Sequence, residues 1–198
     1  MAWQHHISTD RDLLERLLAR HREKQRKYHT ATHVAWVVRC VLELAQVEEV
    51  DDLGAIVAAA FYHDAVYEPV SPANERASAR LARRDLAQLG WDAGRADAVG
   101  TMIEGTRHHV DPADTDTAVL FDADLSILGA DPAGYGEYSR QIRSEYHHLV
   151  DDEWRQGRSD VLRSFVERSS IYATESGRNE WEERARANIA AELALLSP

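Results

Sequence analysis

Residues 53–64 read LGAIVAAAFYHD, an apolar stretch that ends in a histidine and an aspartate. Asp51 and Asp52 come directly before the stretch and suit the capped start of a helix. The apolar side chains recur at helical spacing, and Pro69 disfavours helical backbone at Glu68. The stretch therefore predicts a buried helix that ends near Glu68-Pro69.

Helical periodicity continues along the rest of the chain, with no convincing alternating strand pattern. There is no internal repeat, low-complexity tract or Gly/Ser linker, so we expect one domain over residues 1–198. The sequence thus predicts an all-α fold, a single compact bundle of about eight or nine helices. Besides the first stretch, the expected helices cover approximately residues 10–21, 30–45, 74–89, 93–108, 115–128, 131–149, 159–165 and 179–196.

Composition excludes several classes of protein. The 198 residues are 44% hydrophobic and 29% charged, which is typical of a globular domain. A net charge of −11 argues against a general nucleic-acid binder. The single cysteine, Cys40, allows no internal disulfide. No apolar run reaches the length of a membrane span and the first residues lack a signal peptide, so we expect a cytoplasmic protein with neither a membrane nor a nucleic-acid partner.

Three polar residues occupy positions that the helical period assigns to the core. His33 lies in line with the apolar stripe of its helix, Asp64 follows Ala60 by four residues, and Asp124 follows Leu120 by four. Each of the three has an ordinary explanation when taken alone, as a hydrogen-bonded core histidine or a helix cap. Together they require a common partner, because an unpaired buried carboxylate is costly.

A divalent metal ion is the natural partner, and His63 completes the set. The adjacent pair His63-Asp64 offers two ligands from one helix end, while His33 and Asp124 come from separate helices. Imidazole and carboxylate ligands suit first-row divalent ions better than calcium. The sequence does not distinguish Mn, Mg, Co, Ni, Fe and Zn.

The order His33 … His63-Asp64 … Asp124 resembles the H…HD…D signature of the HD superfamily of metal-dependent phosphohydrolases. A closer resemblance, to a mainly bacterial group of predicted metal-dependent HD phosphohydrolases with no settled substrate, extends from about residue 26 to residue 193. Its motifs are Tyr28-His29-x3-His33, Phe61-Tyr62-His63-Asp64-Ala65-Val66-Tyr67, Asn74-Glu75-x2-Ser78-Ala79, Asp122-Ala-Asp124-Leu125, Ile127-Leu-Gly129, Ile142-Arg143-x-Glu145-Tyr146 and Ala185-Arg186-x-Asn188.

The resemblance implies an HD-domain helical bundle in which His33, His63, Asp64 and Asp124 are the metal ligands. It also implies a metal-dependent phosphohydrolase that uses a metal-activated water. The expected substrate is a nucleotide or another small phosphate ester. Asp122, two residues before Asp124, belongs on a different helix face and is an alternative partner for a ligand histidine.

Three residues are candidates for the catalytic acid or base, beside the ligand Asp64. His29 lies one helical turn before His33 and should share its face. Glu75 begins a helix just beyond the HD pair, and Glu68 competes with it. The Asn-Glu pairing of the resembling group favours Glu75, although a first-turn acid is also an ordinary helix-start residue.

Arg143 and Arg186 are candidates for binding phosphate, since a guanidinium group matches phosphate oxygens bidentately. Salt bridges to Glu145 and Glu182 are the ordinary alternative for these two arginines. We expect Arg143 to face the same cavity as His29.

Other functions stay open at this point. The pair His108-His109 suits either the C-terminal end of a helix or a second metal ion. With a second ion the protein would be a non-hydrolytic HD-fold metal protein, similar to di-iron oxygenases. A structural or sensor domain that keeps the metal for stability is a further alternative. The oligomeric state is open, with a homodimer as one alternative.

Overall fold

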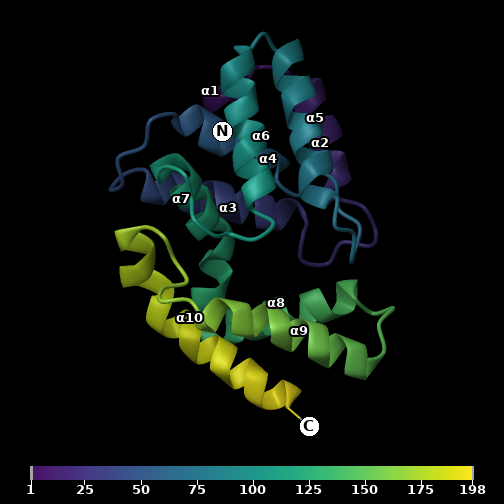
Figure 1. The fold of residues 1–198 in the computed structure, drawn as a ribbon. Coiled ribbons are helices and arrows are strands. Elements are labelled where there is room, and N and C mark those ends of the chain that lie inside the picture. The colour runs from purple at the N-terminus through teal and green to yellow at the C-terminus, as the bar shows by residue number, and fades with distance from the viewer. Residues whose placement is uncertain (1, 198) are drawn as a thin grey trace.

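The computed structural model describes residues 2–197, and the regular secondary structure of this part of the chain is helical, without a strand. Ten α-helices and one short 3-10 helix confirm the all-α fold (Figure 1). None of these helices combines the length and the apolar character that crossing a bilayer requires. The elements are α1 Ala2–His6, α2 Arg11–Arg20, α3 Ala31–Leu44, α4 Leu53–Tyr62, α5 Asn74–Gln88, α6 Ala93–Gly105, α7 Thr115–Leu125, η1 Ser126–Gly129, α8 Pro132–Glu145, α9 Asp151–Val166 and α10 Glu175–Leu196.

Polar capping residues set the starts of several helices as the sequence predicts. The side chain of Asp10 accepts a hydrogen bond from a backbone N–H in the first turn of α2. Thr30 does the same for α3, and Asp52 for α4. Each cap satisfies a backbone donor that has no partner within the helix.

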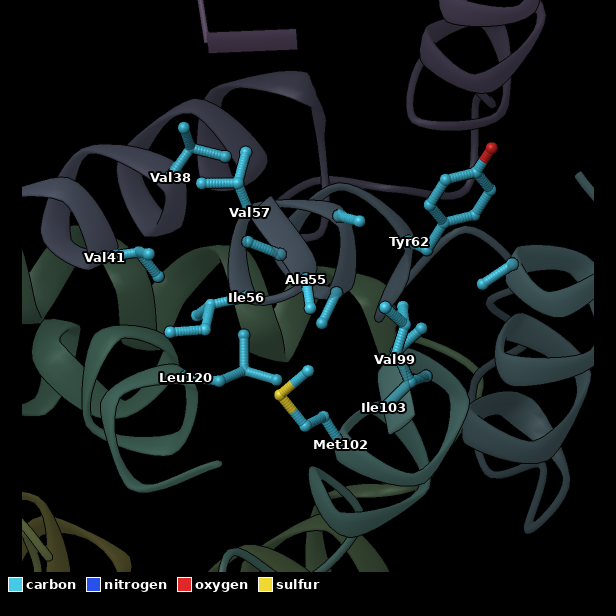
Figure 2. Packing of buried hydrophobic residues seen from close by; sticks show 14 of the residues in the cluster. Val38, Val41, Ala55, Ile56, Val57, Tyr62, Val99, Met102, Ile103 and Leu120 are labelled. Carbon is cyan, nitrogen blue, oxygen red and sulfur yellow. The ribbon is translucent and has the colours of Figure 1, made fainter. Parts of the chain in front are cut away.

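Helix α4 is the centre of the first core. It contacts α1, α3, α5, α6 and α7, and its residues 55–60 are fully or almost fully buried. Figure 2 shows Ile56 directed toward Leu120 and Val57 close to Val38. The apolar stretch over residues 53–62 is therefore packed among five other helices, and the His63-Asp64 pair follows at its inner end.

A second core lies in the C-terminal third, in the lower part of Figure 1. There α10 packs against η1 and α9, and η1 also contacts α8. Trp181 on α10 packs against both cores and so connects them. The buried residues of this second core are Leu125, Leu128, Tyr135, Leu162, Ile171, Tyr172, Ala185 and Ile189.

Several helix boundaries differ from the prediction: α8 ends at Glu145 and not near residue 149, α10 begins at Glu175 and not at residue 179, and the differences at α4 and α9 are larger. Helix α4 ends at Tyr62, not near Glu68, because the backbone after His63 finds a side-chain partner elsewhere. The Ser78 hydroxyl on α5 accepts a hydrogen bond from the N–H of Val66 and donates one to its carbonyl. This contact leaves His63 and Asp64 at a helix end, where both side chains are available to a ligand.

The second of the larger differences is at α9, which begins at Asp151 and not at Ser159. Residues 151–158 carry one large apolar side chain, Trp154, and include Gly157, so the segment lacks an apolar stripe. Three acidic residues in the first turn favour the start that the structure shows.

Candidate metal centre

Two helices and the loop after α4 bring three metal-binding groups together. His33 lies in the first turn of α3, His63 caps the end of α4, and Asp64 follows it. One ligand atom from each of the three residues lies within 4.8 Å of the other two. His33 Nε2 and His63 Nε2 are 3.1 Å apart, and Asp64 Oδ2 lies 3.0 Å from His63 Nε2 and 3.5 Å from His33 Nε2. The structure thus assembles three of the four expected ligands.

These spacings fit a shared ion. Metal–ligand bonds of about 2.1 Å place adjacent ligand atoms about 3.0 Å apart at a right angle and about 3.4 Å apart at a tetrahedral angle. The observed 3.0, 3.1 and 3.5 Å fall close to that range. His63 Nδ1 donates to the carbonyl of Ala60, which leaves the Nε2 of a neutral ring with a free lone pair. His33 Nδ1 is buried without a hydrogen-bond partner in the described residues, so only its Nε2 side has polar partners.

Asp124, the fourth expected ligand, lies against the same two histidines. It is not part of the mutually close group, yet its Oδ1 lies 3.1 Å from His33 Nε2 and 3.4 Å from His63 Nε2. Its Oδ2 is 2.9 Å from His109 Nε2. One carboxylate therefore connects the histidine pair to a third imidazole.

His109 reaches this position through its backbone. Its φ of 49° lies in the left-handed region, which non-glycine residues seldom adopt. Arg168 donates to the carbonyls of His108 and His109 at 2.8 and 2.6 Å and fixes the turn. His108 itself is exposed, so only the second histidine of the pair belongs to the site.

The histidines and carboxylates of the cluster shift one another's pKa values toward the charged forms. Burial lowers the pKa of His63, but the charges of Asp64 and Asp124 outweigh burial and raise the pKa well above its usual value. Burial raises the pKa of Asp64, but the neighbouring charge of His63 outweighs it and keeps the pKa well below the usual value. The carboxylates stay ionised and attract positive charge, either protons on the histidines or a metal ion that replaces them.

His29 is held at the edge of the cluster by a buried glutamate on α8. Glu145 Oε2 accepts hydrogen bonds from His29 Nδ1 at 2.6 Å and from the hydroxyl of Tyr67 at 2.8 Å. The ring of His29 also stacks on that of Tyr67. Because Nδ1 donates the proton to Glu145, the tautomer is fixed and Nε2 of the neutral ring is left with a free lone pair.

The buried side chain of Arg26 connects the segment that contains His29 to the segment that contains Asp64. Arg26 donates to the carbonyl of His29 at 3.1 Å, to that of Asp64 at 2.7 Å and to that of Ala65 at 3.3 Å. Its side chain is fully buried, so these bonds are shielded from water. The backbones of the acid–base candidate and of the ligand pair are thus tied to one guanidinium group.

Two cavities open onto the cluster. The polar cavity, of about 430 Å³, is lined by Asp64, Asp124, His29, His109 and Glu75 among others. The apolar cavity, of about 530 Å³, continues between α8 and α9. His29, His109 and Asp124 border both cavities, so the two cavities meet at the candidate metal centre.

The two glutamates that are candidates for the catalytic acid or base differ in whether they line the polar cavity. Glu75, in the first turn of α5, lines the polar cavity. Glu68 is exposed and borders neither cavity, and its backbone is hydrogen-bonded to the amide of Asn74. The geometry therefore favours Glu75 over Glu68.

The two arginines that we expected to bind phosphate lie elsewhere, and the predicted position of Arg143 in the cavity is wrong. Arg143 donates to the carbonyls of Tyr146 and Leu149 and pairs with Asp151, closing the turn between α8 and α9. Arg186 pairs with Glu182 and donates to carbonyls of residues 166, 168 and 169. Both guanidinium groups are occupied by the protein's own acceptors.

Asp122 does not orient a ligand histidine. Its carboxylate accepts three hydrogen bonds, one from the N–H of Ala173 and two from the N–H and hydroxyl of Thr174. It therefore anchors the loop that leads into α10. The helical period places residues 122 and 124 on different faces, and the structure agrees.

Sequence reasoning missed two residues of this region. It gave Glu145 no role beyond a motif position and a salt bridge to Arg143, and it left His109 open between a helix end and a second metal ion. Glu145 carries a weak signal, a carboxylate three residues after the apolar Ile142 on the inward side of α8. The position of His109 depends on a left-handed turn that the sequence does not announce.

Comparisons of the chain with protein-family models, with curated proteins and with solved structures each found no match. The function proposed next is therefore supported by the residues of this chain and their arrangement alone.

Proposed function

We propose that this protein is an HD-type, metal-dependent phosphohydrolase that cleaves a nucleotide or another small phosphate ester. The observation that carries the proposal is the group of His33, His63 and Asp64, three ligand atoms from two helices and a loop spaced as around one ion. Asp124 would complete the set from α7. A bound divalent ion would supply Lewis-acid activation of water and of the phosphoryl oxygen.

In this proposal His29 is the catalytic base. Its Nε2 accepts a proton from the attacking water while the water oxygen forms a bond to phosphorus. The ester P–O bond breaks, its electron pair goes to the ester oxygen, and that oxygen takes up a proton. Glu145 positions His29 and stabilises the imidazolium through the 2.6 Å bond to Nδ1.

Glu75 is the candidate acid on the other side of the polar cavity. It would deliver the proton to the leaving oxygen. A positioned acid or base contributes about 10²- to 10⁴-fold to the rate. Replacing Glu75 by glutamine should therefore slow turnover and leave metal binding intact.

The test combines elemental analysis with a screen of phosphate esters in Mn, Mg, Co and Ni. Asp64→Asn should lose both the ion and turnover, while Asp160→Asn, at an exposed carboxylate of α9, should keep both. Well under one ion per chain in the unsubstituted protein, purified without chelator, contradicts the metal site. A full complement of ion with no turnover on the panel, and a lower melting temperature after metal removal, indicates a structural or sensor role.

The position of His109 supports one second candidate, an oxygen-activating protein with two irons. Asp124 has one oxygen near the histidine pair and the other on His109, which is the arrangement of a carboxylate that bridges two ions. This candidate predicts two irons per chain and a visible absorption band, whereas the phosphohydrolase requires neither.

A further inference from the structure

We infer that the apolar cavity is the subsite for the organic part of the substrate, and that this substrate is a phosphate monoester with an extended apolar body. The inference rests on the proposed function, because it assigns the phosphate group to the polar cavity. It also narrows that function, since it favours an alkyl or similar apolar monoester over a nucleotide.

The apolar cavity has the size and the lining of a site for a small organic molecule. Its volume of about 530 Å³ lies within the range of sites for small organic molecules, about 300–1,000 Å³. Its lining between α8 and α9 is mostly aliphatic and aromatic, so it offers few partners for the polar edge of a base or for a sugar. Representative lining residues are Leu125, Ile142, Leu149, Trp154, Val161 and Phe165.

The two cavities are continuous at the reacting groups. His29, His109 and Asp124 lie in the walls of both, together with Thr106 and Arg107. A phosphate at the metal cluster would therefore leave its ester oxygen facing the apolar cavity. The body of the substrate has space to extend from that oxygen between α8 and α9.

The charges of the lining exclude a polyphosphate. The only arginines in the two linings are Arg107 and Arg158, and neither lining contains a lysine. Arg158 is buried and paired with Glu192 through two hydrogen bonds. Glu75 and Glu153 add negative charge at the cavities. Asp64 and Asp124 together balance the charge of one divalent ion, so Arg107 is the cation of the two linings left to meet the charge of a monoester, and the walls cannot balance the additional charge of a di- or triphosphate.

Gly157 gives direct access to the apolar cavity for a test. It lies on α9 in the cavity wall, and a Cβ added there meets no atom within 4 Å. The side chain of Gly157→Leu would therefore start in open space at the cavity wall. Gly136→Leu on α8 is the matched control, because it borders neither cavity and its Cβ makes only an ordinary 3.6 Å contact with Arg140.

The experiment measures binding of methyl-, butyl- and octylphosphonate to the manganese-loaded protein by titration calorimetry. The C–P bond keeps these probes intact, so binding is read without turnover. Burying one methylene is worth about a fourfold change in affinity, so octylphosphonate should bind at least about tenfold more tightly than butylphosphonate. Gly157→Leu should abolish most of this gain and leave methylphosphonate unaffected, while Gly136→Leu should behave as the unsubstituted protein.

An affinity that does not change with chain length, or tighter binding of adenosine monophosphate than of octylphosphonate, overturns the inference. The same holds if both glycine variants lose the gain equally. The chain-length series on the unsubstituted protein stands even if Gly157→Leu does not fold. Hydrolysis of phosphate esters is measured separately, so a chain-length gain without turnover would refute the phosphohydrolase and keep the apolar subsite.

Discussion

Replacing Glu145 by glutamine should destabilise the protein strongly, although the change alters only one atom and one charge. Oε1 accepts the backbone N–H groups of Lys27, Tyr28 and His29 at 2.6, 2.8 and 3.1 Å, and Oε2 accepts His29 Nδ1 and the Tyr67 hydroxyl. A glutamine amide keeps one acceptor, but its NH₂ group must face the two donors that Oε2 received. The variant therefore loses the negative charge, and its NH₂ group faces His29 Nδ1–H and the Tyr67 hydroxyl, which are themselves donors.

The pKa of Glu145 gives the size of the expected loss in the free energy of unfolding. Burial raises this pKa, but the hydrogen bond and charge of His29 and the backbone N–H groups outweigh burial and lower the pKa from 4.5 to about 2. A difference of about 2.5 units between the unfolded and folded states corresponds to about 3 kcal/mol of stability at pH 7. Because the folded pKa is the lower one, this stability is complete above pH 4.5 and is lost as the pH falls toward 2. About 1 kcal/mol of it should remain at pH 3.

Urea unfolding of both proteins at a series of pH values between 7 and 3 measures the difference. Glu137→Gln is the control on the same helix, because Glu137 is exposed and its pairing with Arg140 is screened by water. We expect Glu145→Gln to lower the free energy of unfolding by about 3 kcal/mol at pH 7, with a gap that narrows as the pH falls. A loss of less than about 1 kcal/mol at pH 7, or a gap that is independent of pH, would refute the assignment of Glu145 as the buried anion that fixes His29.

Three further results are expected. With an ion at the proposed site, chelation should lower the melting temperature, measured by calorimetry, because such an ion would bind only where the folded chain brings α3, the end of α4 and α7 together. Arg143→Ala and Arg186→Ala should each change KM for a phosphate ester by less than twofold. Both variants should be less stable in urea, since both guanidinium groups hold loop carbonyls. A tenfold rise in KM would indicate that the arginine binds the substrate. Gly129→Ala should cost about 1–3 kcal/mol in urea, because the added Cβ would lie 2.5 Å from Trp181 Cβ and 2.9 Å from its Cα. A stability equal to that of the unsubstituted protein would show that α10 moves aside easily.

Sequence periodicity predicted the helical elements well where an apolar stripe and a polar cap occur together. Helices α2, α3 and α4 start within about one residue of the expected positions, because their caps Asp10, Thr30 and Asp52 act on neighbouring residues in the chain. It failed where neither signal is present, as at the start of α9. Helix α1, with five residues, is too short for periodicity to reveal.

For the candidate site as well, the local helical period predicted the positions of some residues and not of others. Positions on the inward face of a helix placed His33, Asp64 and Asp124 near one another, because burial follows from the local period. The surroundings of Arg143 depend on where the chain turns after α8, which the local period does not contain. The Glu145–His29 bond joins residues 116 positions apart and depends on the packing of α8 against the site.

The separation of the two cores has a consequence for how this protein diversifies. The candidate metal ligands precede Leu125, whereas residues 132–166 supply half of the residues that line the apolar cavity. Under the proposed function, a gene can accumulate changes in residues 132–166, or exchange that segment with a relative, and so alter half of the apolar cavity wall while it keeps the candidate metal ligands. Glu145 lies within the exchangeable segment and holds His29, so every viable recombinant must keep a carboxylate at that position.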